Sequence, residues 1–282
     1  MEIDLVAGKG DLAPGDHRSA QFNWQGFDRI QPISILDPIF KLSYERLWRE
    51  FGEKGELEKE DVLSDRMKWN PSEIDDGYSY SYFMNVIMNG SDWVAVRDHT
   101  VISSQESSSA IVHLSHVLID PRYRRTGLAG WLRAWPVQHA RWALRAAGLP
   151  ENSPITLVAE MEGDEPLLDS QIARLKSYQK SGFLMVDSET VSYYQPDFRP
   201  PAVIDDSGGP QPVPLKLVIR RVGREIHKEV SGAEITHIVS ALYKMYEKGF
   251  RRRDMQELWK SLRTHYPSPQ ARVKLVKPYE KN

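Results

Sequence analysis

The sequence predicts a mixed α/β fold built around one sheet. Strand-like and helix-like segments alternate through the middle of the 282-residue chain, and β-rich segments lie on either side of that middle. The composition, with 40% hydrophobic and 27% charged residues, is typical of a globular protein that can bury a sizeable core. The sequence contains no internal repeat.

The first regular elements are predicted from capping and breaking signals. Residues 1–35 are expected to form an irregular arm or a short strand. A helix is predicted to begin at Asp37-Pro38, because aspartate caps a helix and proline loses nothing in the first turn. A second helix is expected over residues 57–69, since a helix disfavours continuing into Asn70-Pro71.

A β-rich tract follows these helices. Residues 81–88 and 93–96 flank Asn89-Gly90, a pair that supplies the positive φ angles of a tight hairpin turn. A polar run at 103–109 then separates the second strand from a further strand over 110–119. Asn89-Gly90-Ser91 also matches a glycosylation acceptor, but the hairpin turn is the preferred interpretation because no secretory signal precedes it.

The second half is predicted to continue the alternation. A helix over 128–147 is expected to close at Gly148, with a kink or an early break at Pro136. The remaining expected elements are a strand at 155–160, a helix at 169–180, a strand at 183–194, a breaker-rich connector at 199–214, a strand at 215–222, and helices at 233–248 and 252–263 before a polar tail.

Composition excludes several classes of chemistry. With no cysteine, the chain has no disulfides, no thiolate metal sites and no cysteinyl acyl-enzyme. A net charge of −2 gives no overall basic field for nucleic acid or anionic lipid. No apolar run approaches the length of a signal peptide core or a membrane span, so a cytoplasmic location is expected.

The segment after the strand at 110–119 has the features of a phosphate-binding loop. A strand, a tight turn and a helix start bring unpaired backbone N–H groups to one point, where the helix dipole favours an anion. Gly127 is expected to let the backbone approach a phosphate, and the small residues Ala129 and Gly130 leave the first helical turn uncovered by side chains. The predicted diphosphate-binding residues are Arg124, Arg125, Thr126, Gly127, Leu128, Ala129 and Gly130.

Neither a Walker loop nor a dinucleotide fingerprint is present. The run Arg124 to Ala129 instead resembles the R-x-x-G-x-G/A signature of the GNAT superfamily of N-acetyltransferases, and Ile119-Asp120-Pro121 resembles the family's V-x-P. A second stretch, Tyr178 to Phe183, is similar to the family's Y-x-x-x-G-F, and Gln171 stands where many members have asparagine. The resemblance covers about residues 36–222 and implies an arm (1–35), an acetyltransferase domain (36–224) and a C-terminal helical extension (225–282).

The resemblance implies a mostly antiparallel sheet whose fourth and fifth strands splay apart to admit acetyl-coenzyme A. Backbone groups of Val117, Leu118 and Ile119 would then bind the pantetheine arm and the acetyl carbonyl. An N–H group aimed at that carbonyl would stabilise the oxyanion of the tetrahedral intermediate. The amine acceptor would attack the thioester directly, without an acyl-enzyme.

Two proton transfers then need candidate groups. The resemblance implies that Tyr178 protonates the leaving thiolate; a tyrosine that only shapes the channel is the alternative. His113 is a candidate base, although a histidine on a half-buried strand is also commonly structural. His116 is expected on the opposite strand face, so no metal site is predicted. Glu160 and Glu162 could attract or deprotonate a cationic amine, or they could be surface carboxylates.

The acceptor is not readable from the sequence, because one fold serves many amines. The extra mass around the core hints at a small molecule or a peptide end. A non-catalytic acyl-coenzyme A sensor or scaffold with the same fold is the alternative function. The basic C-terminal helices around residues 251–253 are interleaved with acids, so a solvated face or a homodimer contact is expected rather than nucleic-acid binding.

Overall fold

The computed structural model describes residues 8–52, 55–162 and 168–280. The chain divides into two compact units, Met1–Leu157 and Val158–Asn282, each of which is described by itself. Within the described residues, no helix is both long enough and apolar enough to cross a bilayer.

Unit 1 is built on a long antiparallel hairpin. Its elements are η1 (Lys9–Asp11), η2 (Pro14–Gln21), β1 (Phe27–Ile30), α1 (Pro38–Leu47), η3 (Trp48–Gly52), α2 (Glu60–Arg66), β2 (Tyr78–Asn89), β3 (Asp92–Ser104), β4 (Ser109–His113), β5 (Val117–Ile119), η4 (Pro121–Tyr123), α3 (Leu128–Ala146) and the first residues of β6 (Ile155–Glu162).

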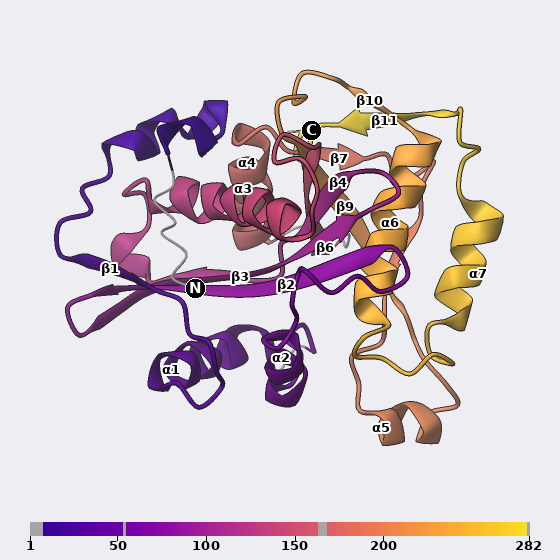
Figure 1. The fold of residues 1–282 in the computed structure, drawn as a ribbon, viewed down its shortest axis with the longest axis horizontal. Coiled ribbons are helices and arrows are strands. Elements are labelled where there is room, and N and C mark those ends of the chain that lie inside the picture. The colour runs from indigo at the N-terminus through magenta and orange to yellow at the C-terminus, as the bar shows by residue number, and fades with distance from the viewer. Residues whose placement is uncertain (1–7, 53–54, 163–167, 281–282) are drawn as a thin grey trace. The chain divides into compact units, whose positions relative to one another are not determined.

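The strands of unit 1 are mostly antiparallel. The order is β1-β2-β3-β4, with β5 also paired to β3, and β4 lies parallel to β6. Helices α1 and α2 cover one face of the β2–β3 hairpin and α3 covers the other (Figure 1). The predicted mixed, mostly antiparallel sheet flanked by helices is therefore confirmed.

Unit 2 contains the remainder of β6 together with α4 (Asp169–Lys180), β7 (Leu184–Val186), β8 (Tyr193–Gln195), α5 (Pro201–Asp206), β9 (Val213–Arg221), β10 (Glu229–Ser231), α6 (Gly232–Tyr246), α7 (Gln256–His265) and β11 (Arg272–Val276). Its strand order is β6-β9-β7-β11-β10, with β8 paired to β9. The predicted bounds of α4 are confirmed, and Gly182 follows it with a φ of 79°.

Several predicted elements are wrong in unit 1. The helix expected over 57–69 spans only Glu60–Arg66, because the Glu58 carbonyl accepts a hydrogen bond from Tyr44 and its carboxylate forms a buried ion pair with Arg66. The hairpin turn uses Gly90 and Ser91 rather than Asn89 and Gly90, since Asn89 pairs with Asp92. With φ of 59° at Gly90, this fits a turn with glycine at the first central position.

The long helix is closer to its prediction. Asp37 caps α1 through Ile39 N–H, and α3 ends before Gly148, whose φ is 75°, as expected. The early break predicted at Pro136 is wrong, because α3 runs through it and the buried proline ring packs in the core side of the helix. Tertiary packing offsets the lost backbone hydrogen bond.

Corrections in unit 2 have local causes. The strand expected over 183–194 is two short strands, because the Asp187 carboxylate accepts from Glu189 N–H and Thr190 Oγ1 and turns the chain. The connector at 199–214 contains α5, which begins at consecutive prolines. The polar tail contains β11, where Val273 and Leu275 are buried, so the C-terminal segment is not purely helical.

Candidate functional site

The strand expected over 110–119 is interrupted at residues 114–116, which gives β4 and β5. At the break, the Asp98 carboxylate replaces a backbone acceptor: its Oδ1 accepts from His116 N–H at 2.8 Å. The His116 carbonyl in turn accepts from Asp98 N–H at 3.2 Å. The Asp98 side chain therefore completes the hydrogen bonding between β3 and the chain at the point where the strand is interrupted.

His116 is fixed in this break as an imidazolium. Its Nδ1 donates to Asp98 Oδ1 at 3.1 Å and its Nε2 donates to the Glu56 carbonyl at 2.9 Å. Burial alone would lower the pKa of His116, but Asp98 and the carbonyl outweigh burial and raise it. Burial alone would raise the pKa of Asp98, but His116 outweighs burial and lowers it. Asp98 and His116 form a buried structural ion pair that no local sequence pattern indicates, because the two residues are 18 positions apart.

His113 lies at the end of β4, opposite Thr100 of β3, and is buried. Its Nδ1 is 3.3 Å from the Ser115 hydroxyl. It does not share a site with His116, whose nitrogens are both engaged as described above. Among the residues that the structure describes, no cluster of histidine and carboxylate side chains could hold a metal ion.

The free edge of β5 is defined by its pairing with β3. Asp120 N–H donates to the Val94 carbonyl at 2.9 Å, so these two residues form a hydrogen-bonded pair. Leu118, two positions before Asp120, is paired with Val96. In an antiparallel ladder, bonded pairs alternate with non-bonded pairs, so Leu118 faces β3 whereas the backbone groups of Val117 and Ile119 point to the other edge. Of the three residues predicted to bind pantetheine, these two have backbone groups on the free edge.

The loop after β5 begins with a capped turn. Asp120 Oδ1 accepts from Arg122 N–H at 2.9 Å and starts η4, and Thr126 Oγ1 donates to the Tyr123 carbonyl at 2.8 Å. Arg125 and Gly127 both have left-handed backbones, with φ of 65° and 102°, and Gly127 caps α3. When right-handed or extended residues alternate with left-handed residues, successive backbone N–H groups point toward the same side of the loop.

The backbone N–H groups of residues 125–129 have no acceptor within the described parts of the chain, whereas Gly130 N–H donates to Gly127 carbonyl at 3.1 Å. They lie at the start of the 19-residue helix α3, where the dipole is positive. Arg124 and Arg125 are exposed beside them, and Arg124 Nε donates to the Ile119 carbonyl at 3.1 Å. This arrangement can bind an anion of several oxygens.

An N-terminal segment, η2, packs on this helix start. A Cβ at Gly127 would lie 3.2 Å from Ser19 Cα, and one at Gly130 would lie 2.2 Å from Ser19 Oγ. Trp131 Nε1 donates to the Ser19 carbonyl at 2.7 Å, and Arg133 pairs with Asp16 at 2.7 Å. Both glycines therefore make room for the chain itself, a contact over more than one hundred residues that no local pattern could have indicated.

Tyr178 lies in α4 of unit 2, and the residue is 6% exposed. The ring packs edge-on against Phe183 with centroids 4.7 Å apart. Its hydroxyl has no hydrogen-bond partner within the described residues and is not one of the buried polar atoms that lack a partner. The contact with Phe183 thus fixes the position of the ring.

Glu160, on β6 in unit 2, is instead heavily engaged. Its Oε1 accepts from the Tyr193 hydroxyl, and its Oε2 accepts from Gln195 Nε2 and the Tyr246 hydroxyl, both at 2.9 Å. Burial, followed by the charge of Glu160, raises the pKa of Tyr193 well above its ordinary value. Both carboxylate oxygens therefore accept hydrogen bonds within a partly buried polar network.

Two other predicted residues of unit 2 have local partners. Gln171 Oε1 accepts from Leu168 N–H at 2.7 Å, so this side chain caps the start of α4. Glu162 pairs with Arg174 at 2.8 Å. Neither residue is directed by these contacts to a ligand.

An open groove lies beside α1 and α2 in unit 1. It combines aromatic surface from Tyr44 and Trp48 with three carboxylates, and its lining residues are Ile35, Tyr44, Glu45, Trp48, Arg49, Lys59, Glu60 and Asp61. The connection between these helices reaches the strand break, where the rings of Phe51 and His116 have centroids 5.1 Å apart.

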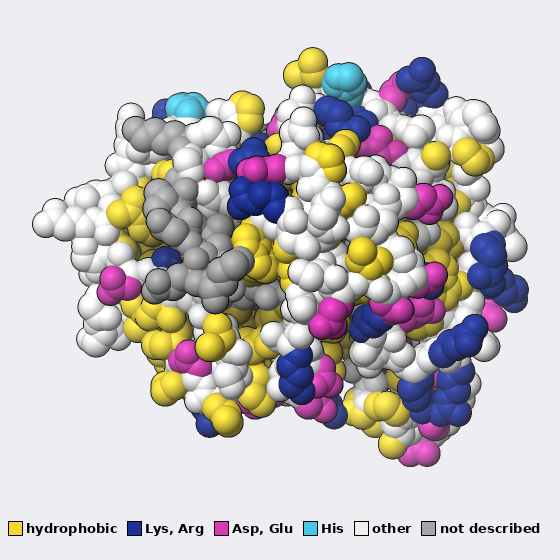
Figure 2. Space-filling view, in the orientation of Figure 1, with side chains coloured by type: hydrophobic (Ala, Val, Ile, Leu, Met, Phe, Trp, Pro, Cys, Tyr) yellow, Lys and Arg dark blue, Asp and Glu magenta, His cyan; other side chains and the backbone are white. Residues whose placement is uncertain are grey.

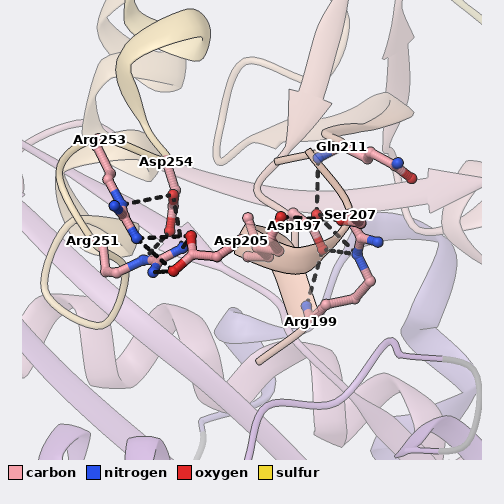
Figure 3. A network of polar contacts seen from close by, with 9 residues as sticks. Asp197, Arg199, Asp205, Ser207, Gln211, Arg251, Arg253 and Asp254 are labelled. Atoms are coloured by element: carbon pink, nitrogen blue, oxygen red, sulfur yellow. Dashed lines mark hydrogen bonds and ion pairs between the residues drawn. The ribbon is translucent and has the colours of Figure 1, made fainter. Parts of the chain in front are cut away.

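The arginine run of the C-terminal segment is largely neutralised within unit 2. Arg251 and Arg253 both pair with Asp205 of α5, at 2.9 and 2.7 Å, and Arg251 also pairs with Asp254 (Figure 3). The hydrogen bond from Arg251 lowers the pKa of Asp205. Figure 2 likewise shows Lys and Arg side chains interspersed with Asp and Glu on the face drawn.

No family model matches the sequence, and no curated protein matches it. Solved structures of similar fold include the GNAT-family acetyltransferase of Streptococcus pneumoniae, with 13% identity, a TM-score of 0.36, and coverage of 69% of this chain and 99% of the other. The ribosomal-protein-S18-alanine N-acetyltransferase of Escherichia coli has 14% identity, a TM-score of 0.33, and coverage of 69% and 94%.

A third is an aminoglycoside acetyltransferase from an uncultured soil metagenomic sample, with 11% identity, a TM-score of 0.35, and coverage of 56% of this chain and 88% of the other. The structural neighbours are acetyltransferases, the class that the two sequence motifs resemble.

Proposed function

We propose that this chain is an N-acetyltransferase that transfers acetyl from acetyl-coenzyme A to an amine by direct attack. The observation that supports the proposal best is the set of N–H groups at residues 125–129, which lack acceptors among the described residues. They follow a strand with a free edge and precede a long helix, so a diphosphate bound there would satisfy them together.

In this proposal, the chain's own residues position the cosubstrate. The N–H groups of the loop hold the diphosphate, and the exposed guanidinium group of Arg125 adds charge to the same side. The backbone groups of Val117 and the N–H group of Ile119, whose carbonyl already accepts from Arg124, hold the pantetheine arm as a neighbouring strand would. A backbone N–H of this edge stabilises the oxyanion that forms on the acetyl carbonyl.

Proton transfer is assigned to residues from the second motif and the central strands. Tyr178 is the proposed acid for the leaving thiolate, supported by a hydroxyl that has no hydrogen-bond partner among the described residues. His113 is the proposed base. Glu160 is the weaker candidate, because its oxygens already accept three hydrogen bonds.

The groove beside α1 and α2 is the proposed acceptor entrance. Glu45, Glu60 and Asp61 would attract a cationic amine, and the exposed Trp48 ring offers a surface for its carbon skeleton. The acceptor is accordingly a small amine or a peptide end that carries positive charge.

A second candidate function, an acyl-coenzyme A sensor that does not turn over, is favoured by the engagement of Glu160. The two functions are separated by measuring release of free coenzyme A thiol from acetyl-coenzyme A with a panel of amines, together with cofactor binding. Amine-dependent release above the hydrolysis background supports the acetyltransferase. Cofactor binding without release for any amine supports the sensor, and absence of binding contradicts both.

A further inference from the structure

A buried polar cluster in unit 1 lies between the β2–β3 hairpin and α3, away from the loop described above. Asn85 of β2 and Arg97 of β3 are directly paired, and Phe83 and His99 form the next pair on the same face. Asn85, Arg97, His99 and His139 of α3 are all at most 1% exposed. The proposed acetyltransferase activity does not use these residues.

Hydrogen bonds fix the protons in this cluster. Arg29 Nη2 lies 3.0 Å from His139 Nε2, and because a guanidinium group only donates, this nitrogen must accept. His139 is neutral, since burial lowers its pKa well below its ordinary value, so its proton is on Nδ1. That Nδ1–H donates to His99 Nε2 at 2.8 Å, which leaves the proton of neutral His99 on its Nδ1.

The series of hydrogen bonds from Arg29 through His139 to His99 therefore ends in a buried N–H donor, His99 Nδ1. His99 Nδ1 has no hydrogen-bond partner in the described structure, nor have Arg97 Nε and Arg97 Nη2. Asn85 Oδ1 accepts twice from Arg29, at 2.8 and 3.0 Å, which orients the Asn85 amide and leaves its Nδ2 donor unpaired as well. Four buried nitrogen atoms on neighbouring residues thus present only N–H groups.

The cluster also has uncompensated charge. Arg97 forms no ion pair among the described residues, and its neighbour Asp98 points to the opposite face of the strand, where it bonds His116 and Tyr82. Burial is the largest cause of the low pKa of His99, followed by His139 and then by the positive charge of Arg97. Burying a cation without a partner is strongly unfavourable.

We propose that the N–H groups of Asn85, Arg97 and His99 bind a small monovalent anion such as chloride. The paired Cβ atoms of Asn85 and Arg97 are about 5 Å apart and His99 is about 7 Å further along the strand, within reach of one ion. One water molecule has two lone pairs, so it cannot satisfy four nitrogen atoms, and it brings no charge. Arg97 is also in register with Val117, so β5 runs beside β3 at this position of the sheet.

The test is the thermal unfolding of the full-length protein in sodium chloride or sodium bromide, compared with sodium gluconate at equal ionic strength and pH. The gluconate anion is too large for the proposed site. The proposal predicts a saturating rise of Tm by a few degrees, about what ligand linkage gives well above Kd. Arg97→Met should abolish this rise. The matched control, Arg145→Met on α3, removes an exposed arginine and should keep it.

Crystals grown in bromide provide a readout that does not depend on any variant folding. An anomalous bromide peak beside Arg97 is expected. The proposal is overturned if Tm is the same in chloride and gluconate, if the anion dependence persists in Arg97→Met, or if the density beside Arg97 contains only water.

Discussion

Replacing Gly127 by alanine perturbs the proposed diphosphate loop at one backbone position. Gly127 has φ of 102° and ψ of −10°, a left-handed conformation that costs a residue with a Cβ about 1–2 kcal/mol. The added Cβ would also lie 3.2 Å from Ser19 Cα, a backbone atom that cannot move independently of η2. The loop is therefore expected to leave this conformation in the unliganded variant.

Binding of coenzyme A would then have to restore the strained conformation. If the strain and the contact with Ser19 together amount to about 1–3 kcal/mol, the affinity falls by roughly 5- to 150-fold. The N–H groups themselves are retained, so the loss reports their arrangement and not their number. Folding stability should fall by a similar amount, about 1–3 kcal/mol.

Gly148→Ala is the matched control for this change. Gly148 follows the other end of α3 with φ of 75°, and a Cβ there meets no atom within 4 Å. It should cost about 1 kcal/mol of stability and leave coenzyme A affinity unchanged. Isothermal titration calorimetry and thermal unfolding of both variants make the comparison. The reasoning is refuted if Gly127→Ala binds coenzyme A as tightly as wild type, or if both variants lose affinity equally.

Three further predictions concern single side chains. Tyr178→Phe keeps the ring packing on Phe183 and should lower kcat by about 100- to 10,000-fold with unchanged coenzyme A affinity, checked by steady-state kinetics and calorimetry; an unchanged kcat would assign the tyrosine to packing. Asp98→Asn leaves His116 without its buried counterion and should destabilise unit 1 by about 3–5 kcal/mol in chemical unfolding; a loss under 1 kcal/mol, roughly that of a surface pair, would contradict the buried imidazolium. Because the pKa of His116 is raised, its contribution to stability is complete below about pH 6.5 and is lost as pH rises through the raised value. The Tm of the wild-type protein should therefore decline over this pH range, and His116→Gln should make the decline less steep. An equally steep decline in the variant would contradict this.

Local signals were enough to predict most elements. Asp37 as a cap, the glycines that follow α3 and α4, and the alternation of apolar segments all act over a few residues. Predictions were wrong where distant residues decide the outcome. Glu58 shortens α2 through Tyr44 and Arg66, and the tail forms β11 because β7 and β10 offer their edges.

The candidate site divides in the same way. The left-handed Gly127 and the helix start after it follow from the local sequence, because glycine is favoured there. The contact of Ser19 with that glycine, and the Asp98 carboxylate in the strand break, depend on residues far away in sequence. Glu160 was singled out by its place on a strand, but its partners Tyr193 and Tyr246 come from later elements.

The central claim, that backbone N–H groups at the start of α3 bind a diphosphate, is tested most directly by calorimetric titration of the full-length protein with coenzyme A and, in parallel, with pantetheine, which lacks the diphosphate. The account predicts saturable binding of coenzyme A and at least tenfold weaker binding of pantetheine, about 1.4 kcal/mol or more. A folded sample that gives no binding heat with coenzyme A over a range of temperatures, or that binds pantetheine equally well, would contradict it.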